Sequence, residues 1–326
     1  MMDKKVKCTK VAPTKVTAGS GTYYETDVVA ACLIELLREE RFENASGSIM
    51  TGVSVQKQDD LWRLDDVLLE YQDSLGSQIL VPTSIKSFSL FAKTNERREF
   101  VLHGWTDMYS IDRRPRPFSI GCDFLGLFAN FGGSIHLQQI NTLLGKARQQ
   151  RDDFCHRIVE SGNFENAERW LEWLAKPDGL NGGVSDDDKS RQAFIAALHV
   201  RDFDFGAKSS TSLQRCLNDC RLLTVEQSPI EGERLWMELW RIARQVRETG
   251  GDLNRSKLLD ELDVKIQLKQ SPRFERFYRI LQERSDEDLA AQPRMIGGKL
   301  HLTRIGAVKS LDSQLDSSDD DPLVVI

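Results

Sequence analysis

Apolar residues recur at helical spacing along residues 22–40, TYYETDVVAACLIELLREE, and polar or charged residues lie between them. Because 3.6 residues complete one turn, Val28, Cys32 and Leu36 fall on one side of such a helix. The pattern therefore predicts an α-helix with a buried apolar face at the start of a folded domain.

Three runs rich in β-branched and apolar residues follow, at 48–56, 61–71 and 77–90. The turn-like segments QKQDD and QDSLGS separate them. Short apolar runs bounded by turn residues indicate β-strands. We therefore predict a helix followed by a meander of three strands, which is a compact start for a fold of mixed α/β (α+β) class.

Helical spacing dominates from residue 100 onward. It is found at 100–110, 121–131, 135–162 and 166–175, and again in a block from about Ser212 to residue 284. Between the two groups, residues 191–205 predict a helix that runs into a late strand near Val200–Phe205, where apolar and charged residues alternate. Gly250 and Gly251 predict the end of one helix, and Asn254 or Ser256 the cap of the next.

The composition excludes several classes of protein. Lys and Arg number 44 against 50 Asp and Glu, a formal net charge of −6, so no basic excess over the whole chain marks it as binding nucleic acid. A local basic groove remains compatible with that count. No apolar run approaches the ~20 residues that span a bilayer, and no apolar stretch of a secretory signal follows MMDKKVKCTK.

Six scattered cysteines favour reduced thiols and a cytoplasmic location. Cys216 and Cys220 lie four apart in a helical segment, and we predict that they are buried core residues. A metal site is the alternative for this pair, although no His or Cys pair at ligand spacing lies nearby.

Glu25 on the first predicted helix, Asp65 or Asp66 at the start of a strand and Lys86 within the next strand are the candidate catalytic residues. Carboxylates bind a hard divalent cation that neutralises a scissile phosphate and acidifies an attacking water. A neighbouring Lys orients that water or stabilises the transition state. The pattern suits a Mg²⁺-dependent phosphodiesterase. Its alternative is an exposed strand Lys that only discourages aggregation.

These residues lie in segments that resemble a known family. The helix TYYETDVVAACLIELL, the strands LDDVLLEY and SQILVPTSIKSF and the helical run containing Trp105 resemble the nuclease domain of the PD-(D/E)xK superfamily, which has the restriction-endonuclease-like fold. In particular, they are similar to the Mrr- and DUF4297-like nucleases of bacterial anti-phage defence, which occur in cyclic-oligonucleotide-activated endonucleases and as effectors of antiviral STAND NTPases of the AVAST type. CDFLGLFANF and residues 231–262 resemble the helical region that joins such nucleases to a P-loop ATPase.

The resemblance implies a role for each matching residue. Asp66 takes the position of the metal-binding Asp, with Asp65 as its competitor, and Lys86 that of the family's Lys. Glu25 takes the position of the helical Glu that completes the metal site, and the backbone carbonyl of Ile85 is a further ligand for Mg²⁺ or Mn²⁺. Ser84 departs from the family's Glu, Asp or Gln, and a serine hydroxyl is a weaker and shorter ligand. Water then completes the coordination, or the site has lost activity.

A basic segment and an N-terminal arm are the candidates for gripping DNA through its phosphates. Arg113, Arg114 and Arg116 lie in IDRRPRPFS, which reads as an extended loop, and Lys15 ends a Lys-rich arm. A solvated surface loop is the alternative. We found no motif for reading base sequence, so any cleavage is expected to be largely independent of sequence.

The expected organisation has four parts: a flexible basic arm (1–18), a nuclease-like domain with helical insertions (19–228), a helical adaptor (229–292) and an acidic linker (293–326). The terminal PLVVI resembles the strand before a Walker A loop, so a truncated ATPase domain is expected to follow. The expected function is double-stranded DNA cleavage by a homo-oligomeric effector of a bacterial antiviral protein with ATPase and sensor domains. The alternatives are a weakened nuclease fold kept for oligomerisation or DNA binding, and a helical scaffold in which Asp66 and Lys86 form only a salt bridge.

Overall fold

The computed structural model describes most of residues 20–269 and part of 291–304. The described ranges are 20–44, 47–55, 62–64, 66–73, 75–88, 94–109, 116–132, 135–149, 153–160, 167–178, 180, 187–207, 209–263, 266–269, 291–296 and 299–304. Lys15, Asp65, Arg113 and Arg114, together with the predicted arm over residues 1–18, lie outside these ranges.

A mixed sheet forms the centre of the molecule. In the described part of the chain it has six strands in the order β5-β4-β3-β2-β1-β6. The strands are β1 (Ile49–Val55), β2 (Val67–Gln72), β3 (Gln78–Lys86), β4 (Leu125–Ala129), β5 (Leu198–Asp202) and β6 (Gly251–Asn254). Neighbours are antiparallel from β6 through β3, whereas β3, β4 and β5 are parallel. The predicted meander and the late strand are both confirmed.

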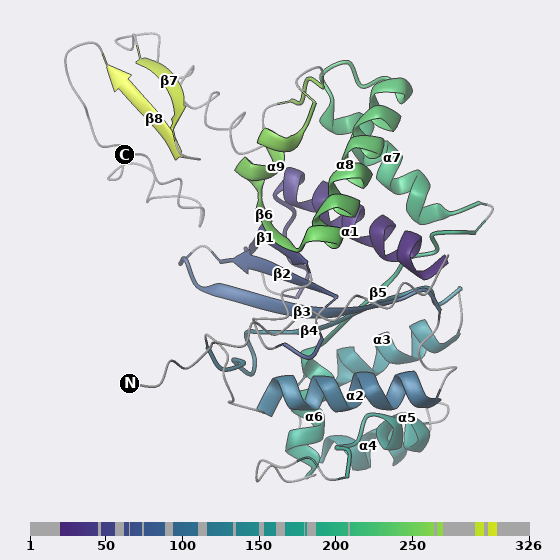
Figure 1. Cartoon of the computed structure of the whole chain (residues 1–326). Helices are drawn as coiled ribbons and strands as arrows, with labels where there is room; N and C mark the ends of the chain where they lie inside the picture. Colours follow the sequence, from purple (N-terminus) through teal and green to yellow (C-terminus); the bar gives the residue numbers. More distant parts are fainter. Residues whose placement is uncertain are drawn as a thin grey trace, which may run out of the picture.

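Helices cover both faces of this sheet, as Figure 1 shows. On one face lie α1 (Ser20–Arg38), α7 (Thr211–Leu223), α8 (Pro229–Thr249) and α9 (Arg255–Glu261). On the other lie α2 (Thr94–Tyr109), α3 (Ile135–Ala147), α4 (Phe154–Glu160), α5 (Ala167–Trp173) and α6 (Asp188–Ala197). Each face has its own apolar core, so the fold is the mixed α+β class that the sequence predicts. None of the described helices has the length and apolar character of a membrane span.

The segment 121–131 is the clearest error of the sequence interpretation. It was expected to be helical, but Leu125–Ala129 forms β4, and each of its residues is buried. A parallel strand covered on both faces is apolar throughout, and a short apolar run of this kind has no period that separates strand from helix. Gly126 is essential to this pairing, because a Cβ atom there would lie 2.1 Å from Oγ1 of Thr83 on β3.

The segment after residue 228 is built into the same sheet and core. The helix α8 packs against α1 through an apolar face that includes Leu235, Leu239 and Ile242. The following strand, β6, pairs with β1, although the sequence predicted only helices here. Asn254 caps α9, as predicted, by accepting a hydrogen bond from the Lys257 N–H. The domain boundary at 228/229 stays a prediction, but the elements on its two sides share one sheet.

A separate two-stranded sheet occupies part of the region where the sequence predicted the end of the adaptor and the start of a linker. Its strands are β7 (Ala291–Ile296) and β8 (Lys299–Arg304), which pair antiparallel. Cys216 and Cys220, predicted to be core residues, are buried in the core beneath α1 and α8.

Candidate active site

Asp66 lies immediately before β2, and its carboxylate is held by β3. Oδ2 accepts hydrogen bonds from the Ile85 N–H at 2.7 Å and from the Ser84 hydroxyl at 3.1 Å. The strand register explains this contact, because Val67 is paired with Thr83, which places the preceding Asp66 beside Ser84. The antiparallel pairing thus fixes the position of one predicted metal ligand.

Lys86 ends β3 on the same side of the strand as Ser84, because side chains two residues apart in a strand share a face. Its Nζ atom lies 3.9 Å from Asp66 Oδ2, and the side chains of Lys86 and Asp66 are each 31% exposed. The pair therefore lies at the edge of the core, open to solvent and to a ligand.

Glu25 approaches the same place from the second turn of α1. Burial raises the pKa of Glu25; the charge of Arg247 opposes this shift, Asp66 adds to it and Lys86 lowers it. These interactions show that the Glu25 carboxylate lies within electrostatic reach of both Asp66 and Lys86. The structure therefore brings Asp66 and Lys86 into contact, and Glu25 of α1 lies near enough to interact with both through its charge.

Arg247 is the member of this cluster that the sequence did not reveal. It lies near the end of α8 and forms an ion pair with Glu25 Oε2. Its other terminal nitrogen donates to the Thr22 carbonyl at 2.6 Å and to the Thr26 hydroxyl at 2.8 Å. No motif could have found this contact, because 222 residues separate Arg247 from Glu25.

The oxygen atoms around Asp66 fit a magnesium ion that keeps several waters. Glu25 and Asp66 supply carboxylates. Within a strand the N–H and C=O of one residue point to the same side, so the Ile85 carbonyl faces the Asp66 side, as its N–H does. Hard oxygen ligands with water are the usual surroundings of Mg²⁺. Among the described residues no three His, Cys, Asp or Glu side chains form a metal-binding group, so a cation held here by Glu25, Asp66 and the Ile85 carbonyl would need water as a further ligand.

Ser84 and Arg247 reduce the ligand capacity of this site. The Ser84 hydroxyl donates to Asp66 Oδ2, and Arg247 occupies Oε2 of Glu25. The two carboxylates and the two cations, Arg247 and Lys86, sum to no net charge. A divalent cation would therefore gain no attraction from an excess of negative charge in this cluster.

Arg116, predicted to bind DNA, is engaged inside the protein. Its terminal nitrogens donate to both oxygens of Asp123, at 2.6 and 2.7 Å, and Asp123 is fully buried. Asp123 in turn accepts a hydrogen bond from the Leu80 N–H on β3. The guanidinium therefore fastens its loop to the sheet, and a contact between Arg116 and DNA stays a prediction.

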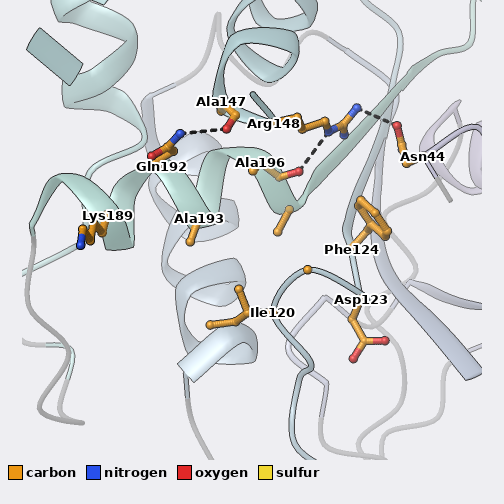
Figure 2. A pocket seen from close by; sticks show the side chains of 12 residues that line it. Asn44, Ile120, Asp123, Phe124, Ala147, Arg148, Lys189, Gln192, Ala193 and Ala196 are labelled. Atoms are coloured by element: carbon orange, nitrogen blue, oxygen red, sulfur yellow. Dashed lines mark hydrogen bonds between the residues drawn. The ribbon is translucent and has the colours of Figure 1, made fainter. Parts of the chain in front are cut away.

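A hollow of about 440 Å³ lies between α3, α6 and the loop before β4. Figure 2 shows Arg148 at its edge, donating to the Ala196 carbonyl and to Asn44, with Phe124 below. Phe124 and Leu198 mark the start of the parallel strands β4 and β5, whereas Lys86 ends their parallel neighbour β3. This hollow is therefore separate from the Glu25–Asp66–Lys86 cluster, and no motif of the sequence indicated it.

No family model matches the sequence, and no curated protein matches it. Among solved structures, two of the Acinetobacter baumannii Cap4 SAVED/CARF-domain containing receptor are similar, one of them with the cyclic trinucleotide 3'3'3'-cAAA. Their TM-scores are both 0.39, their identities 14% and 15%, and the similar region covers 75% of this chain and 45% and 46% of theirs. The chain thus spans about half the length of those receptors, and we infer no function from similarity of this extent.

Proposed function

We propose that the chain hydrolyses phosphodiester bonds of double-stranded DNA with Mg²⁺, for which Mn²⁺ can substitute. The observation that carries this proposal is the partly exposed pair of Asp66, just before β2, and Lys86 of β3, with Glu25 of α1 within electrostatic reach of both. Two carboxylates and a lysine in this arrangement match the chemistry of metal-dependent phosphodiester hydrolysis.

Each residue has a distinct task in this reaction. Glu25 and Asp66 would hold the cation, and the hydrogen bonds from Ser84 and Ile85 keep Asp66 oriented. A bound Mg²⁺ supplies charge neutralisation at the phosphate and a more acidic water. Lys86, whose ammonium group lies beside Asp66, donates a hydrogen bond to the phosphate oxygen on which negative charge develops.

The biological setting that we propose rests on the motifs of the sequence. They resemble the nucleases of bacterial anti-phage proteins, so we assign the chain to a cytoplasmic antiviral effector joined to ATPase and sensor domains. Because a nuclease without sequence preference harms its own cell, activity is expected to need self-association. Monomers that cut DNA as fast as oligomers would contradict this requirement.

Plasmid cleavage tests the proposed reaction. Oligomeric wild-type protein is expected to cut supercoiled plasmid with Mg²⁺ or Mn²⁺ and to leave it intact with EDTA. Lys86→Ala should lower the rate about 100-fold or more, as removal of a preorganised donor at a developing charge does. The matched control is Lys146→Ala, on α3 on the other side of the sheet, which should cut at the wild-type rate. Intact plasmid with wild-type oligomer and either cation would overturn the proposal.

A second function is a binding module that has lost catalysis. Two observations favour it: Ser84 stands where the family has a carboxylate or amide, and Arg247 already occupies one oxygen of Glu25. In that case DNA binding, measured by fluorescence anisotropy, would be equal for wild type and Lys86→Ala, with or without Mg²⁺, and no cleavage would follow.

A further inference from the structure

Arg247 of α8 contacts three acceptors near the start of α1. One terminal nitrogen contacts the Thr22 carbonyl and the Thr26 hydroxyl, and the other contacts Glu25 Oε2. The side chain is only 10% exposed, so the packing of α8 on α1 fixes it in place. The Thr26 hydroxyl itself donates to the Thr22 carbonyl, which closes a small hydrogen-bonded network around the guanidinium.

The ion pair engages one oxygen of Glu25 and leaves the other. Among the described residues, no hydrogen bond reaches Oε1, whereas Oε2 is bound to Arg247. A free glutamate side chain samples several rotamers, and binding a ligand must restrict them at an entropic cost. Arg247 restricts the Glu25 side chain beforehand, because the guanidinium is itself anchored to α1 by two further hydrogen bonds.

A second contact between α8 and the beginning of α1 also holds the helix that carries Glu25. Trp240, two turns before Arg247 on α8, donates from its indole N–H to Asp27 at 3.0 Å, and its ring stacks against Tyr23. Glu25 thus lies between two contacts that hold α1 to α8. The backbone that carries the carboxylate is therefore fixed as firmly as the side chain.

The charge of Arg247 has two opposite consequences for a cation. It repels a divalent ion, but it also orients the carboxylate that binds the ion. Partners that hold a metal ligand from outside the coordination sphere typically change affinity or activity by 10- to 100-fold when removed. In a site with no net negative charge, affinity depends on fixed oxygen positions, and the two effects predict opposite changes in cation affinity when Arg247 is replaced.

We propose that Arg247 is a positioning residue, which directs Glu25 Oε1 toward Asp66 so that the two carboxylates share one divalent cation. This inference rests on the cation site of the proposed function. It concerns cation binding, which is measured without cleavage of DNA.

The test is Mn²⁺ affinity by isothermal titration calorimetry and by the EPR signal of free Mn²⁺, with the whole chain. Arg247→Met, which keeps the length of the side chain but removes its charge and donors, should weaken Mn²⁺ binding about 10-fold. Arg247→Lys, which retains the charge and one donor group, should lose less. Arg244→Met is the matched control: Arg244 lies one turn earlier on α8, is 59% exposed and pairs with Glu248. The Arg244→Met variant should bind Mn²⁺ with the affinity of the wild type.

A double-mutant cycle shows whether Arg247 acts through Glu25. In the Glu25→Gln background, Arg247→Met should cause no further loss of Mn²⁺ affinity. Additive losses, unchanged affinity in Arg247→Met, or tighter binding from removal of its charge would each overturn the inference. Thr26→Val removes only a hydroxyl that anchors Arg247. This milder variant should show a smaller loss in the same direction if Arg247→Met does not fold.

The outcomes separate this inference from the proposed function. A wild-type chain that binds Mn²⁺ with these variant effects but leaves plasmid intact refutes the nuclease and keeps the positioning role. A chain that cuts plasmid while Arg247→Met binds Mn²⁺ as tightly as wild type refutes only the positioning role. A wild-type chain that binds no Mn²⁺ refutes both.

Discussion

Two Glu–Arg pairs on α1 show how the same chemistry serves two different purposes. Near the end of the helix, Glu35 meets Arg201 of β5, and both oxygens of the carboxylate are engaged by the two terminal nitrogens. Near its beginning, Glu25 meets Arg247 of α8 through one oxygen. A bidentate pair satisfies the carboxylate completely. Both oxygens of Glu35 therefore serve a structural ion pair, whereas Glu25 retains one oxygen that could bind a ligand.

The two carboxylates also differ in how far they are exposed to solvent. The Glu35 side chain is 15% exposed and that of Arg201 19%, and the guanidinium also lies over the rings of Phe128 and Phe203. The Glu25 side chain is 32% exposed and lies near the partly exposed Asp66 and Lys86. The Glu25 carboxylate is therefore more exposed than that of Glu35, although Arg247 is itself only 10% exposed.

Breaking the Glu35 pair should have the largest effect on stability. Arg201→Met leaves a partly buried carboxylate without its cation and should lower the free energy of unfolding by about 3–5 kcal/mol. Urea denaturation followed by circular dichroism measures this loss. The double variant Arg201→Met with Glu35→Gln should regain part of it, because no uncompensated charge remains. Equal stability of the single variant and wild type would remove the distinction between the pairs.

The pH dependence of stability should be the next effect in size, and it belongs to the same region. Burial, and then the charges of Arg201 and Arg148, hold the pKa of His199 well below its ordinary value of 6.5. His199 is therefore neutral when folded but takes up a proton when unfolded below about pH 6.5. The stabilisation that comes from keeping His199 neutral is complete above that pH. Below it, the free energy of unfolding falls as the pH drops, by at most about 1.4 kcal/mol per pH unit.

Replacing this histidine tests that assignment. His199→Gln retains a group that can hydrogen-bond to Asn44 and should flatten the decline between pH 6.5 and pH 5 in denaturant titrations. A decline as steep as in wild type would show that other groups cause it.

Neutralising Glu25 should have the smallest effect on stability. Because Glu25 is partly exposed and keeps an amide partner for Arg247 in Glu25→Gln, the free energy of unfolding should change by about 1 kcal/mol or less. Mn²⁺ binding, in contrast, should weaken in calorimetry by at least the roughly 10-fold loss expected of Arg247→Met, and should remain measurable. A loss of stability as large as that of Arg201→Met would mean that both pairs are structural.

Much of the local structure followed from the sequence. The apolar period of residues 22–40 predicted α1, and apolar runs bounded by turn residues predicted the strands next to Asp66 and around Lys86. A spacing of two residues was enough to place Ser84 and Lys86 on one face of β3. The failures occurred where burial hides the period: LGLFA of β4 is apolar at every position, and the four residues of β6 are too short to show alternation.

The candidate site was predictable in part for the same reason. Asp66 and Lys86 belong to consecutive strands joined by a short turn, so their proximity follows from local pairing. The sequence, in contrast, predicted that Arg116 binds phosphate, but in the structure its guanidinium forms an ion pair with the buried Asp123. Whether a charged side chain is available depends on neighbours that a linear pattern does not specify.

The sequence by itself determined the first helix and the three-strand meander, because these depend on patterns of neighbouring residues. It also determined which residue types could suit a divalent cation. Only the tertiary structure decided how the two glutamates of α1 differ. Their partners, Arg201 and Arg247, lie 166 and 222 residues away and arrive through the packing of β5 and α8. Contacts at that range depend on how whole elements bury their apolar faces, and this packing left one oxygen of Glu25 without a protein partner among the described residues.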